Sequence, residues 1–559
     1  MSKTKNIDRT RAQESTNAIE KLYISMRHLF SRGFYKPMGI SGEALRKSLL
    51  LLRPEIYGSI AEERTELDGL VYVIERLPEG IEECQFINLT ADEGYKNSHF
   101  ESIIPPKRRR NCYRIDKDQM NIEITRGRSE IYDILTHLTF LFVESHKIQE
   151  RVSLNEGEDF IREWKYLEDV VLHQKTISED EKEVLIVHLG NILGRTYEEV
   201  SGLCQVFSSE KNPLKFFNLI YWLGKLAINE VFKNKKRTIT FSSVLIEEIG
   251  HHIYGEIWAN DIKKVLKENT LLERPIHIIS ANMHSVLNSI YAQGALPEEA
   301  KKYKGFELYQ LLSNSDSKPL QKKVKDYASE NGLIYVKDTS GTNINVQIID
   351  TDKINFDVSP FKKENSIGEN AVIIVMDYAF GEQAFETMDE LLKPYGKKKD
   401  NIHLDVKSVS IMGKAGILEG GKGDIMIPSA HIFEGTADNY PFENELSKED
   451  LEGFGVQVFD GSMISVLGTS LQNKDLLKFF HDSTWNVIGL EMEGAHYQKA
   501  IQSASKIRGN ISENVKVRYA YYASDNPLET GATLASGGLG MTGVTPTYAI
   551  TQRILEQIL

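Results

Sequence analysis

The chain has 559 residues, of which 41% are hydrophobic and 26% charged, as in ordinary soluble globular proteins, and its length is sufficient for several domains. The formal net charge of −13 argues against a general nucleic-acid-binding protein. Met1–Ser15 lacks the apolar core of a secretory signal, and charged and amide residues interrupt the longest apolar stretch, Phe216–Val231. Three widely spaced cysteines favour reduced thiols. We therefore expect a cytoplasmic protein whose partners include neither membrane nor nucleic acid.

The N-terminal half is expected to be mostly helical. Apolar residues recur at spacings of three and four through the first 60 residues, and Ser129 to about Lys267 has the pattern of long amphipathic helices. Between them, Leu70–Ile74 and Cys84–Leu89 are strand-like. The pattern predicts a mixed helical and strand region over residues 1–128 and a helical domain over 129–270.

Three charged stretches in this half have competing interpretations. The basic loop Lys107–Arg110 and the cluster Lys233–Arg237 could bind the phosphates of a regulatory nucleotide, or could be solvated surface charge. Glu248 and His251 have the spacing of carboxylate-bridged metal sites, but a second such pair is missing from the sequence. A solvated helix face explains them better, so we expect no metal or other cofactor.

The character of the chain changes after Pro275. Ile276–Ile279 is a candidate buried strand, a helix is expected from Met283, and residues 333–358 alternate like strands, which makes 271–362 a small α/β segment. The polar stretch Phe361–Asn370 is a predicted linker. Residues 371–559 then form an α/β domain, with the following expected strands and helix: Ala371–Met376, Val406–Met412, Asp424–Pro428 and Val515–Ala523 as strands, and Glu382–Leu392 as a helix. The sheet is expected to be mixed, with helices on both faces, which gives three layers.

Carboxylates follow two apolar segments of this last domain. Glu491 and Glu493 come after Ile488–Leu490, and the strand Val515–Ala523 leads into Ser524 and Asp525. Ligands of open α/β sheets bind at the carboxyl ends of strands. A carboxylate that accepts hydrogen bonds from hydroxyls and a second one that donates a proton would suit cleavage of a ribose–base bond. Helix capping and turn formation are the alternative explanation for each residue taken alone.

Together, Met492-Glu493-Gly494 and Ser524-Asp525 resemble the ribose and base motifs of the nucleoside phosphorylase and nucleosidase superfamily. Met412–Leu418 is similar to the small-residue turn of that family, and Gly423–Pro428 to the strand that follows it. The resemblance implies that Met492 packs on the ribose, that Glu493 binds its 2′ and 3′ hydroxyls, and that Asp525 protonates the purine at N7. Glu491 and Ser524 would belong to the same substrate-binding surface.

The resemblance also implies roles for four more residues. Glu382, in the loop after the first strand, would activate the attacking water, although the start of a helix also favours a carboxylate there. Gly413 and Gly416 would let the backbone approach the ligand, while Lys414 would hold a phosphate or simply be solvated. His431, in a loop over Ser429–Thr436, would touch the 5′ side of the sugar or be structural. The glycine-dense stretch Gly531–Gly543 is either a flexible loop or a flap and phosphate cradle.

The favoured function is hydrolysis of the N-glycosidic bond of a purine nucleoside or nucleotide, releasing free base and ribose or ribose 5-phosphate. Within the superfamily, the two-part architecture looks most like AMP nucleosidase, with a methylthioadenosine nucleosidase-like C-terminal domain, and the resemblance implies a homo-oligomer. The first alternative is a purine nucleoside phosphorylase. No arginine lies between Tyr378 and Ser410 to bind phosphate, although one from another domain or subunit could. The second alternative is an inactive nucleotide-sensing module. Because the family's early strands are missing from 371–559, Ile276–Ser285 could fold back to supply one.

Overall fold

The computed structural model describes residues 10–108, 110–154, 159–173, 177–209, 212–362, 370–396, 401–436, 438–529 and 539–559. These residues form two compact units. The first unit comprises residues up to Thr125, Glu130–Gly250 and Ser470–Asn473, and the second comprises Arg126–Ser129, His251–Thr469 and Lys474–Leu559. Residues 271–362, which the sequence pattern separates from 371–559, therefore belong to the same compact unit as the C-terminal segment.

The first unit contains a mixed six-stranded sheet in the order β1-β6-β2-β5-β4-β3. Its strands are β1 (Phe34–Tyr35), β2 (Phe86–Thr90), β3 (Ser102–Ile103), β4 (Cys112–Asp116), β5 (Gln119–Glu123) and β6 (Thr238–Phe241). β2 is parallel to both β5 and β6, while the outer pairs are antiparallel. The strand β6 lies within the region predicted as helical, because four residues are too few to interrupt the helical pattern on either side.

Nine helices accompany this sheet among the described residues: α1 (Arg11–Arg32), α2 (Glu43–Leu52), α3 (Leu67–Ile74), α4 (Gly127–Val152), α5 (Arg162–Leu172), α6 (Glu179–Leu193), α7 (Tyr197–Phe207), α8 (Lys215–Phe232) and α9 (Ser243–Gly250). Capping boxes begin α1, α6 and α7 at Thr10, Ser178 and Thr196. The strand predicted over Leu70–Ile74 is wrong: this run lies in α3, where Leu67, Leu70 and Val73 are buried at helical spacing. A short apolar run has no period that separates a strand from a buried helix.

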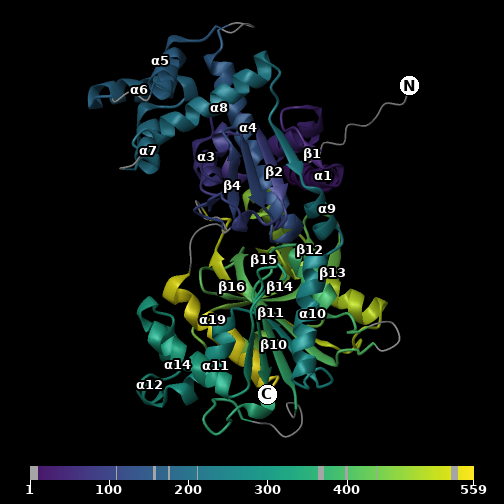
Figure 1. The fold of residues 1–559 in the computed structure, drawn as a ribbon. Coiled ribbons are helices and arrows are strands. Elements are labelled where there is room, and N and C mark those ends of the chain that lie inside the picture. The colour runs from purple at the N-terminus through teal and green to yellow at the C-terminus, as the bar shows by residue number, and fades with distance from the viewer. Residues whose placement is uncertain are drawn as a thin grey trace. The chain divides into compact units, whose positions relative to one another are not determined.

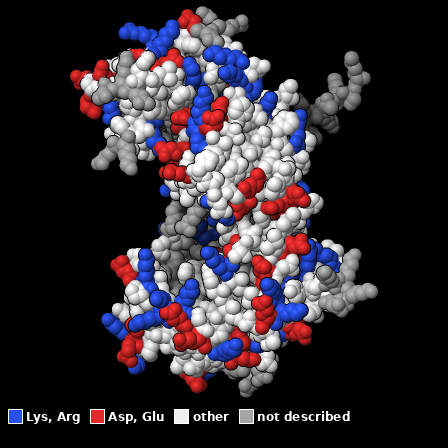
Figure 2. All heavy atoms as spheres, viewed as in Figure 1, with Lys and Arg blue, Asp and Glu red and all other residues white. Residues whose placement is uncertain are grey.

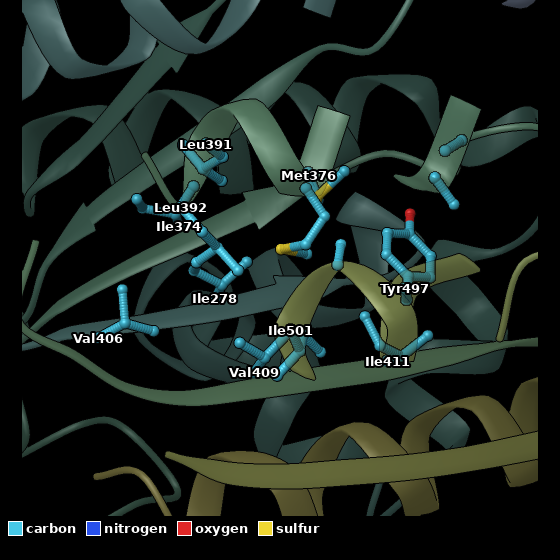
Figure 3. Packing of buried hydrophobic residues seen from close by; sticks show 14 of the residues in the cluster. Ile278, Ile374, Met376, Leu391, Leu392, Val406, Val409, Ile411, Tyr497 and Ile501 are labelled. Atoms are coloured by element: carbon cyan, nitrogen blue, oxygen red, sulfur yellow. The ribbon is translucent and has the colours of Figure 1, made fainter. Parts of the chain in front are cut away.

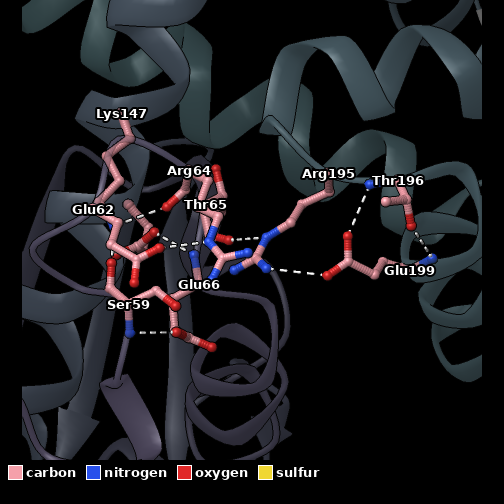
Figure 4. Close-up of polar contacts among 10 residues, drawn as sticks. Ser59, Glu62, Arg64, Thr65, Glu66, Lys147, Arg195, Thr196 and Glu199 are labelled. Atoms are coloured by element: carbon pink, nitrogen blue, oxygen red, sulfur yellow. Dashed lines mark hydrogen bonds and ion pairs between the residues drawn. The ribbon is translucent and has the colours of Figure 1, made fainter.

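Polar contacts hold the segment between α2 and α3 against the long helices of the first unit (Figure 4). Lys147 Nζ of α4 donates to the backbone oxygens of Ser59 and Arg64, at 3.0 and 3.2 Å. Arg195 Nε donates to the oxygen of Thr65 at 2.7 Å, and its Nη1 pairs with Glu199 at 3.1 Å. These side chains satisfy carbonyl groups that no strand or helix uses.

The second unit is built on a ten-stranded sheet in the order β13-β12-β14-β15-β11-β7-β10-β9-β8, with β16 pairing with both β11 and β12. Its strands are β7 (Ile276–Ser280), β8 (Leu333–Val336), β9 (Val346–Asp350), β10 (Val372–Met376), β11 (Val406–Ile417), β12 (Ile425–Phe433), β13 (Asn439–Pro441), β14 (Val458–Ser465), β15 (Val487–Glu491) and β16 (Lys516–Asp525). β7 lies between β10 and β11 and is parallel to both. Ile276–Ser280 therefore supplies a central strand, a question that the sequence left open.

Five of these strands close on themselves. β11 pairs with β16, β16 with β12, β12 with β14, β14 with β15, and β15 again with β11. The enclosed space is tight at Gly489, where an added Cβ would lie 2.4 Å from Met426 Sδ and 2.6 Å from the Gly416 oxygen. Glycine is therefore required at this position by packing.

Helices cover both faces of the sheet around β10 and β11 (Figure 1). α10 (Ile253–Glu268), α15 (Gln383–Leu391) and α18 (Gly494–Gln502) pack on one face, where Ile278, Ile374 and Ile411 meet Leu391 and Tyr497 (Figure 3). The other face is covered mainly by α11 (Met283–Ala295), α14 (Lys318–Glu330) and α19 (Val544–Glu556). The remaining helices are α12 (Pro297–Lys302), α13 (Glu307–Leu312), α16 (Lys448–Leu451) and α17 (Lys474–Asp482). The expected α/β class, with helices on both faces of a mixed sheet, is confirmed at this level.

Two local predictions in this unit are wrong. Gly413–Gly416 is the interior of β11, which continues to Ile417 beside β16, and not a turn. Ser429–Phe433 continues β12, and not a loop, because Ala430–Phe433 pairs with β14 on one side and with β13 on the other. In both places the small or polar residues suggested that the strand ends there. The structure shows that the strand continues, because it pairs with neighbouring strands over these residues.

Other expectations concern regions that the structure covers only in part. Most of the predicted linker Phe361–Asn370 and of the glycine-dense stretch Gly531–Gly543 falls outside the described residues. No helix in the described ranges is long and apolar enough to cross a membrane. The face drawn in Figure 2 has acidic and basic side chains interspersed, without one dominant basic field.

Candidate active site

The carboxyl ends of four parallel strands, β10, β7, β11 and β16, lie side by side in the second unit. β7 ends at Ser280, opposite Met376 of β10 and Ile411 of β11. β11 and β16 extend further, to the pair Gly416 and Asp525. Of the candidate residues, Glu382 lies in the loop after β10, Lys414 and Gly416 lie near the end of β11, and Ser524 and Asp525 end β16.

Asp525 ends β16 next to a register shift between Ala415 and Gly416. Its side chain is buried, at 7% exposure, and Oδ1 forms a hydrogen bond with the Ser524 hydroxyl. Oδ2 is buried without a hydrogen-bond partner among the described residues. Burial raises the pKa of Asp525, while the Ser524 hydroxyl and the charges of Lys414 and Lys422 oppose the rise. Burial thus makes Asp525 easier to protonate than an exposed aspartate, and its Oδ2 is not occupied by a hydrogen bond from the described residues.

A cavity of about 370 Å³ is lined by residues of β11 and β16, but Asp525 is not among its lining residues. Lys414 is exposed on β11, in register with Tyr522 of β16, and both line the cavity. The other lining residues come from α11, the chain before α14, and the start of α19: Asn282, His284, Asn288, Leu312, Ser313, Gln321, Leu539, Gly540, Gly543, Val544, Thr547 and Tyr548. None of the described lining residues is acidic, so Lys414 gives the wall of this cavity a positive charge.

Glu491 and Glu493 occupy different positions although they are two residues apart. Glu491 Oε2 accepts hydrogen bonds from the backbone N–H groups of Glu493 and Gly494, and Oε1 accepts one from the Ser465 hydroxyl. Glu491 thus caps the start of α18 from inside the protein and holds its neighbours in place. Burial, followed by the charge of Glu493, raises the pKa of Glu491 to about 8.

Glu493 faces the loop that leaves β10. Its Oε1 accepts a hydrogen bond from the backbone N–H of Gly381 at 2.9 Å. Burial raises the pKa of Glu493 to about 7, and the N–H groups of Gly381 and Met492 oppose the rise. Met492 is buried, and its Cε lies near Gly381. The loop of β10 and the start of α18 therefore bring Glu493 and Met492 close to the residue before Glu382.

Glu382 is held by Arg128 and Ser129. These two residues belong to the second unit, although they are far from the rest of it in the sequence. The Oε1 of Glu382 lies 3.1 Å from Arg128 Nη1, and its backbone N–H donates to the Ser129 hydroxyl at 2.8 Å. Oε2 is buried and has no hydrogen-bond partner in the described part of the chain. One oxygen is thus fixed by an arginine while the other remains free.

Two further titratable groups lie around Glu382. Burial raises the pKa of Glu386, on α15, to about 8, and the charge of Glu382 adds to the rise. Burial lowers the pKa of His496, on α18, to about 4, and Glu382 opposes this change. Sequence reasoning missed Arg128, Glu386 and His496. The helical spacing of Glu382 and Glu386 was a signal for the second, whereas nothing local pairs Arg128 with a residue 254 positions away.

His431 lies beneath the site and not in it. The side chain is fully buried in β12, and its Nε2 lies 3.1 Å from the Tyr521 hydroxyl. Burial lowers the pKa of His431 to about 3, so the ring is neutral. A Cβ on Gly494 would lie 2.3 Å from His431 Cδ2. His431 thus supports the first turn of α18, and the predicted loop position is wrong because β12 continues through it.

The predicted residues fall into two groups. Glu382, Met492 and Glu493 gather around the loop after β10, while Lys414, Gly416, Ser524 and Asp525 gather at the joint end of β11 and β16. Tyr378 links them: its ring lies 3.8 Å from a Cβ built on Gly413, and its hydroxyl hydrogen-bonds Tyr522. No cluster of three metal-binding side chains occurs where the structure describes the chain.

The sequence matches the family described as "Family of unknown function (DUF6909)" over residues 43–302 and 292–559. No curated protein matches the chain. Solved structures with similarity include the 5′-methylthioadenosine/S-adenosyl homocysteine nucleosidase of Campylobacter jejuni, with 10% identity and a TM-score of 0.31 over 51% of this chain and 99% of that one. The futalosine hydrolase of Helicobacter pylori has 12% identity and a TM-score of 0.30 over 51% and 99%. A nucleosidase of Colwellia psychrerythraea in complex with adenine has 11% identity and a TM-score of 0.28 over 51% and 96%.

Proposed function

The chain belongs to the DUF6909 family, whose function is unknown, and we propose that its second unit hydrolyses the N-glycosidic bond of a purine nucleoside or nucleotide. The observation that carries the proposal is Asp525, a buried carboxyl at the end of a parallel strand, with one oxygen that has no hydrogen-bond partner among the described residues. It lies three residues after Tyr522, which lines the cavity that contains Lys414, and the charge of Lys414 acts on its pKa. Such a group is suited to donate a proton to a leaving base.

In the proposed reaction, the bond between C1′ of the ribose and the purine nitrogen breaks, and its electron pair leaves with the base. Asp525 Oδ2 donates a proton to the purine, at N7, so that the base leaves as a neutral molecule. Water adds to C1′, and Glu382 Oε2 takes up its proton. The positive charge that develops on the sugar is stabilised by nearby carboxylates in a water-poor site.

Glu493 and Met492 bind the ribose in this proposal. Gly381 orients Oε1 of Glu493, which leaves the other oxygen for the sugar hydroxyls. Glu491 acts as a positioning residue, because its hydrogen bonds fix the first turn of α18. Lys414 binds a phosphate at the 5′ position, since it is the one charged residue that lines the cavity.

The experiment is to incubate the pure protein with AMP, adenosine, inosine or methylthioadenosine, with and without phosphate, and to measure free base by chromatography. Base release without phosphate is expected, with AMP preferred over adenosine. Asp525→Asn should lower the rate by about 10²–10⁴-fold. The matched control is Asp405→Asn, an exposed carboxylate next to the opposite end of β11, which should change nothing.

Two other outcomes would contradict hydrolysis. Release only in the presence of phosphate, with ribose 1-phosphate as product, would identify a phosphorylase. The position of Arg128 beside Glu382 supports this second candidate, because Arg128 is an arginine within reach of the loop after β10. Binding without any release of base, unchanged in Asp525→Asn, would identify a nucleotide-sensing module.

A further inference from the structure

A separate cavity of about 230 Å³ lies within the first unit. It is bounded by α3, the segment that follows α3, the loop Ile103–Pro106, the end of α7 and the start of α8. Its walls are mainly aliphatic, with Val71, Ile74, Leu77 and Leu219 among them, and one aromatic ring, Phe207. The proposed reaction uses none of these residues.

Carboxylates outnumber cations around this cavity. Glu75, Glu79 and Glu82 line it, against one lysine, Lys215. Lys215 Nζ is 2.7 Å from Glu79, and Glu75 lies 3.9 Å from Arg76. Glu82 forms no ion pair with any residue that the structure describes. Among the three carboxylates that line the cavity, Glu82 is therefore the one without an ion pair among the described residues, although the charge of Lys215 acts on it at longer range.

The aromatic wall of the cavity is one of two stacked rings. The Phe207 ring stacks on Phe216 of α8, with ring centroids 5.4 Å apart and an interplanar angle of 17°. An ammonium group is attracted both by a carboxylate and by the face of an aromatic ring, and the attraction strengthens where water is excluded. The aliphatic walls would remove an apolar substituent from water.

We propose that this cavity binds a small organic cation that carries one ammonium group on an apolar body, with Glu82 as its counter-ion. Phe207 contributes a cation–π contact, and the aliphatic walls hold the apolar body. An anion is disfavoured by the three carboxylates, and a neutral apolar molecule would leave Glu82 without a partner.

The ionisation of Glu82 supports the same conclusion. Burial raises the pKa of Glu82 to about 7. Its own backbone N–H and Lys215 lower the pKa, and Glu83 and Glu79 raise it. A bound cation favours the carboxylate over the carboxyl, so that binding releases a proton when the pH is near or below 7. The affinity for a permanent cation should consequently rise with pH.

The test is calorimetric titration of the full chain with three probes of similar apolar body and different charge: benzyltrimethylammonium, benzyl alcohol and benzoate. Only the ammonium compound should bind appreciably. Its affinity should be about tenfold lower at pH 6 than at pH 8, because the charge of the probe does not change with pH and that of Glu82 does. Equal binding of the alcohol would overturn the proposal.

Two variants separate Glu82 from the general negative charge of this region. Glu82→Gln should remove both the preference for the cation and its pH dependence, while the folded state, measured by circular dichroism, is retained. Glu83→Gln is the matched control, since Glu83 pairs with Arg114 at 2.8 Å and does not line the cavity. Unchanged cation binding in Glu82→Gln would contradict the proposal.

A protein surface is the competing occupant. Ile104 and Val206 line the cavity and are 59% and 65% exposed, so a second copy of the chain could cover it. Sedimentation velocity of the wild type and of Val206→Asp distinguishes the two. A self-association that Val206→Asp abolishes, together with no binding of benzyltrimethylammonium, would replace the small cation by a subunit interface.

Discussion

Two sets of buried carboxylates, one in each unit, have opposite pKa shifts. In the first unit, burial opposes ionisation of Glu230, yet the charge of Arg237 and the hydrogen bond of His146 lower its pKa to about 2. Burial likewise opposes ionisation of Asp133, and His137, Arg108 and Arg110 hold its pKa below the usual range. In the second unit, burial dominates and raises the pKa of the four carboxyls Glu386, Glu434, Glu491 and Glu493 to about 7–8.

The difference distinguishes carboxylates that stabilise the fold from carboxyls that are available to a ligand. A buried carboxylate that an arginine satisfies has no capacity left for another molecule. A buried carboxyl that no cation pairs with can donate a proton or accept a hydrogen bond from a substrate. Glu82 of the first unit resembles the second set, because burial raises its pKa, it has no ion pair among the described residues, and it lines a cavity.

The first prediction concerns the paired carboxylates of the first unit and has the largest expected change in stability. Arg237→Met removes the partner of Glu230, at a site where both side chains are 1% exposed. We expect a loss of about 3–5 kcal/mol in the free energy of unfolding, because the buried carboxylate loses its arginine and keeps only the hydrogen bonds of His146 and of the backbone N–H at position 237. Urea denaturation measures it. The exposed pair Arg64 and Glu62 provides the control, and Arg64→Met should leave the midpoint unchanged.

The second prediction concerns the unpaired carboxyls of the second unit. Glu386 is 5% exposed, and its folded-state pKa of about 8 lies above the unfolded value. The folded state therefore binds the proton more tightly, and this contribution to stability is present at low pH and lost as the pH rises through 8. Glu386→Gln should be more stable than the wild type at pH 9, by about 1–3 kcal/mol, and equal to it at pH 5.

Thermal unfolding at both pH values checks this prediction. Glu298→Gln, which changes an exposed carboxylate, should have the same pH dependence as the wild type. An equal pH dependence in Glu386→Gln and the wild type would show that the carboxyls at the end of the sheet are not the neutral groups described above.

The third prediction tests the close packing beneath the site. Gly494→Ala would place a Cβ 2.3 Å from His431 Cδ2 and 2.7 Å from the Tyr521 hydroxyl oxygen. We expect a loss of about 1–3 kcal/mol, as for other overpacked positions. Displacement of α18 should also raise the KM for the nucleotide, since Glu493 immediately precedes this helix. A variant with normal stability and normal KM would contradict the supporting role of His431.

The fourth prediction has the smallest expected change in stability, and this change is stabilising. Gly202 lies in the exposed middle of α7, where a Cβ would meet no atom within 4 Å among the described residues. Gly202→Ala should stabilise the protein by about 0.5–1 kcal/mol, because alanine loses less backbone entropy in a helix. The change in the unfolding midpoint measures it. Destabilisation would contradict this prediction and would indicate that another molecule packs against α7 at Gly202.

Local sequence patterns predicted the local structure of the second unit well. The strands around Ile276–Ile279, Ala371–Met376 and Val515–Ala523 occur where the apolar runs are, because a strand buried on both faces needs apolar residues at every position. The same reasoning placed Asp525 and Glu493 at strand ends. It failed for Leu70–Ile74, since a short apolar run suits a buried helix equally well.

The sequence by itself determined which segments are strands and which polar residues follow them, because these properties depend on neighbours along the chain. The tertiary structure alone decided that β7 is inserted between β10 and β11, that Arg128 reaches Glu382, and that His431 is enclosed by β12, α18 and Tyr521. The pairing of β7 with β10 and the ion pair of Arg128 with Glu382 join residues 96 and 254 positions apart. Hydrophobic periodicity does not encode such pairings, since every buried apolar strand has the same pattern whichever neighbour it pairs with.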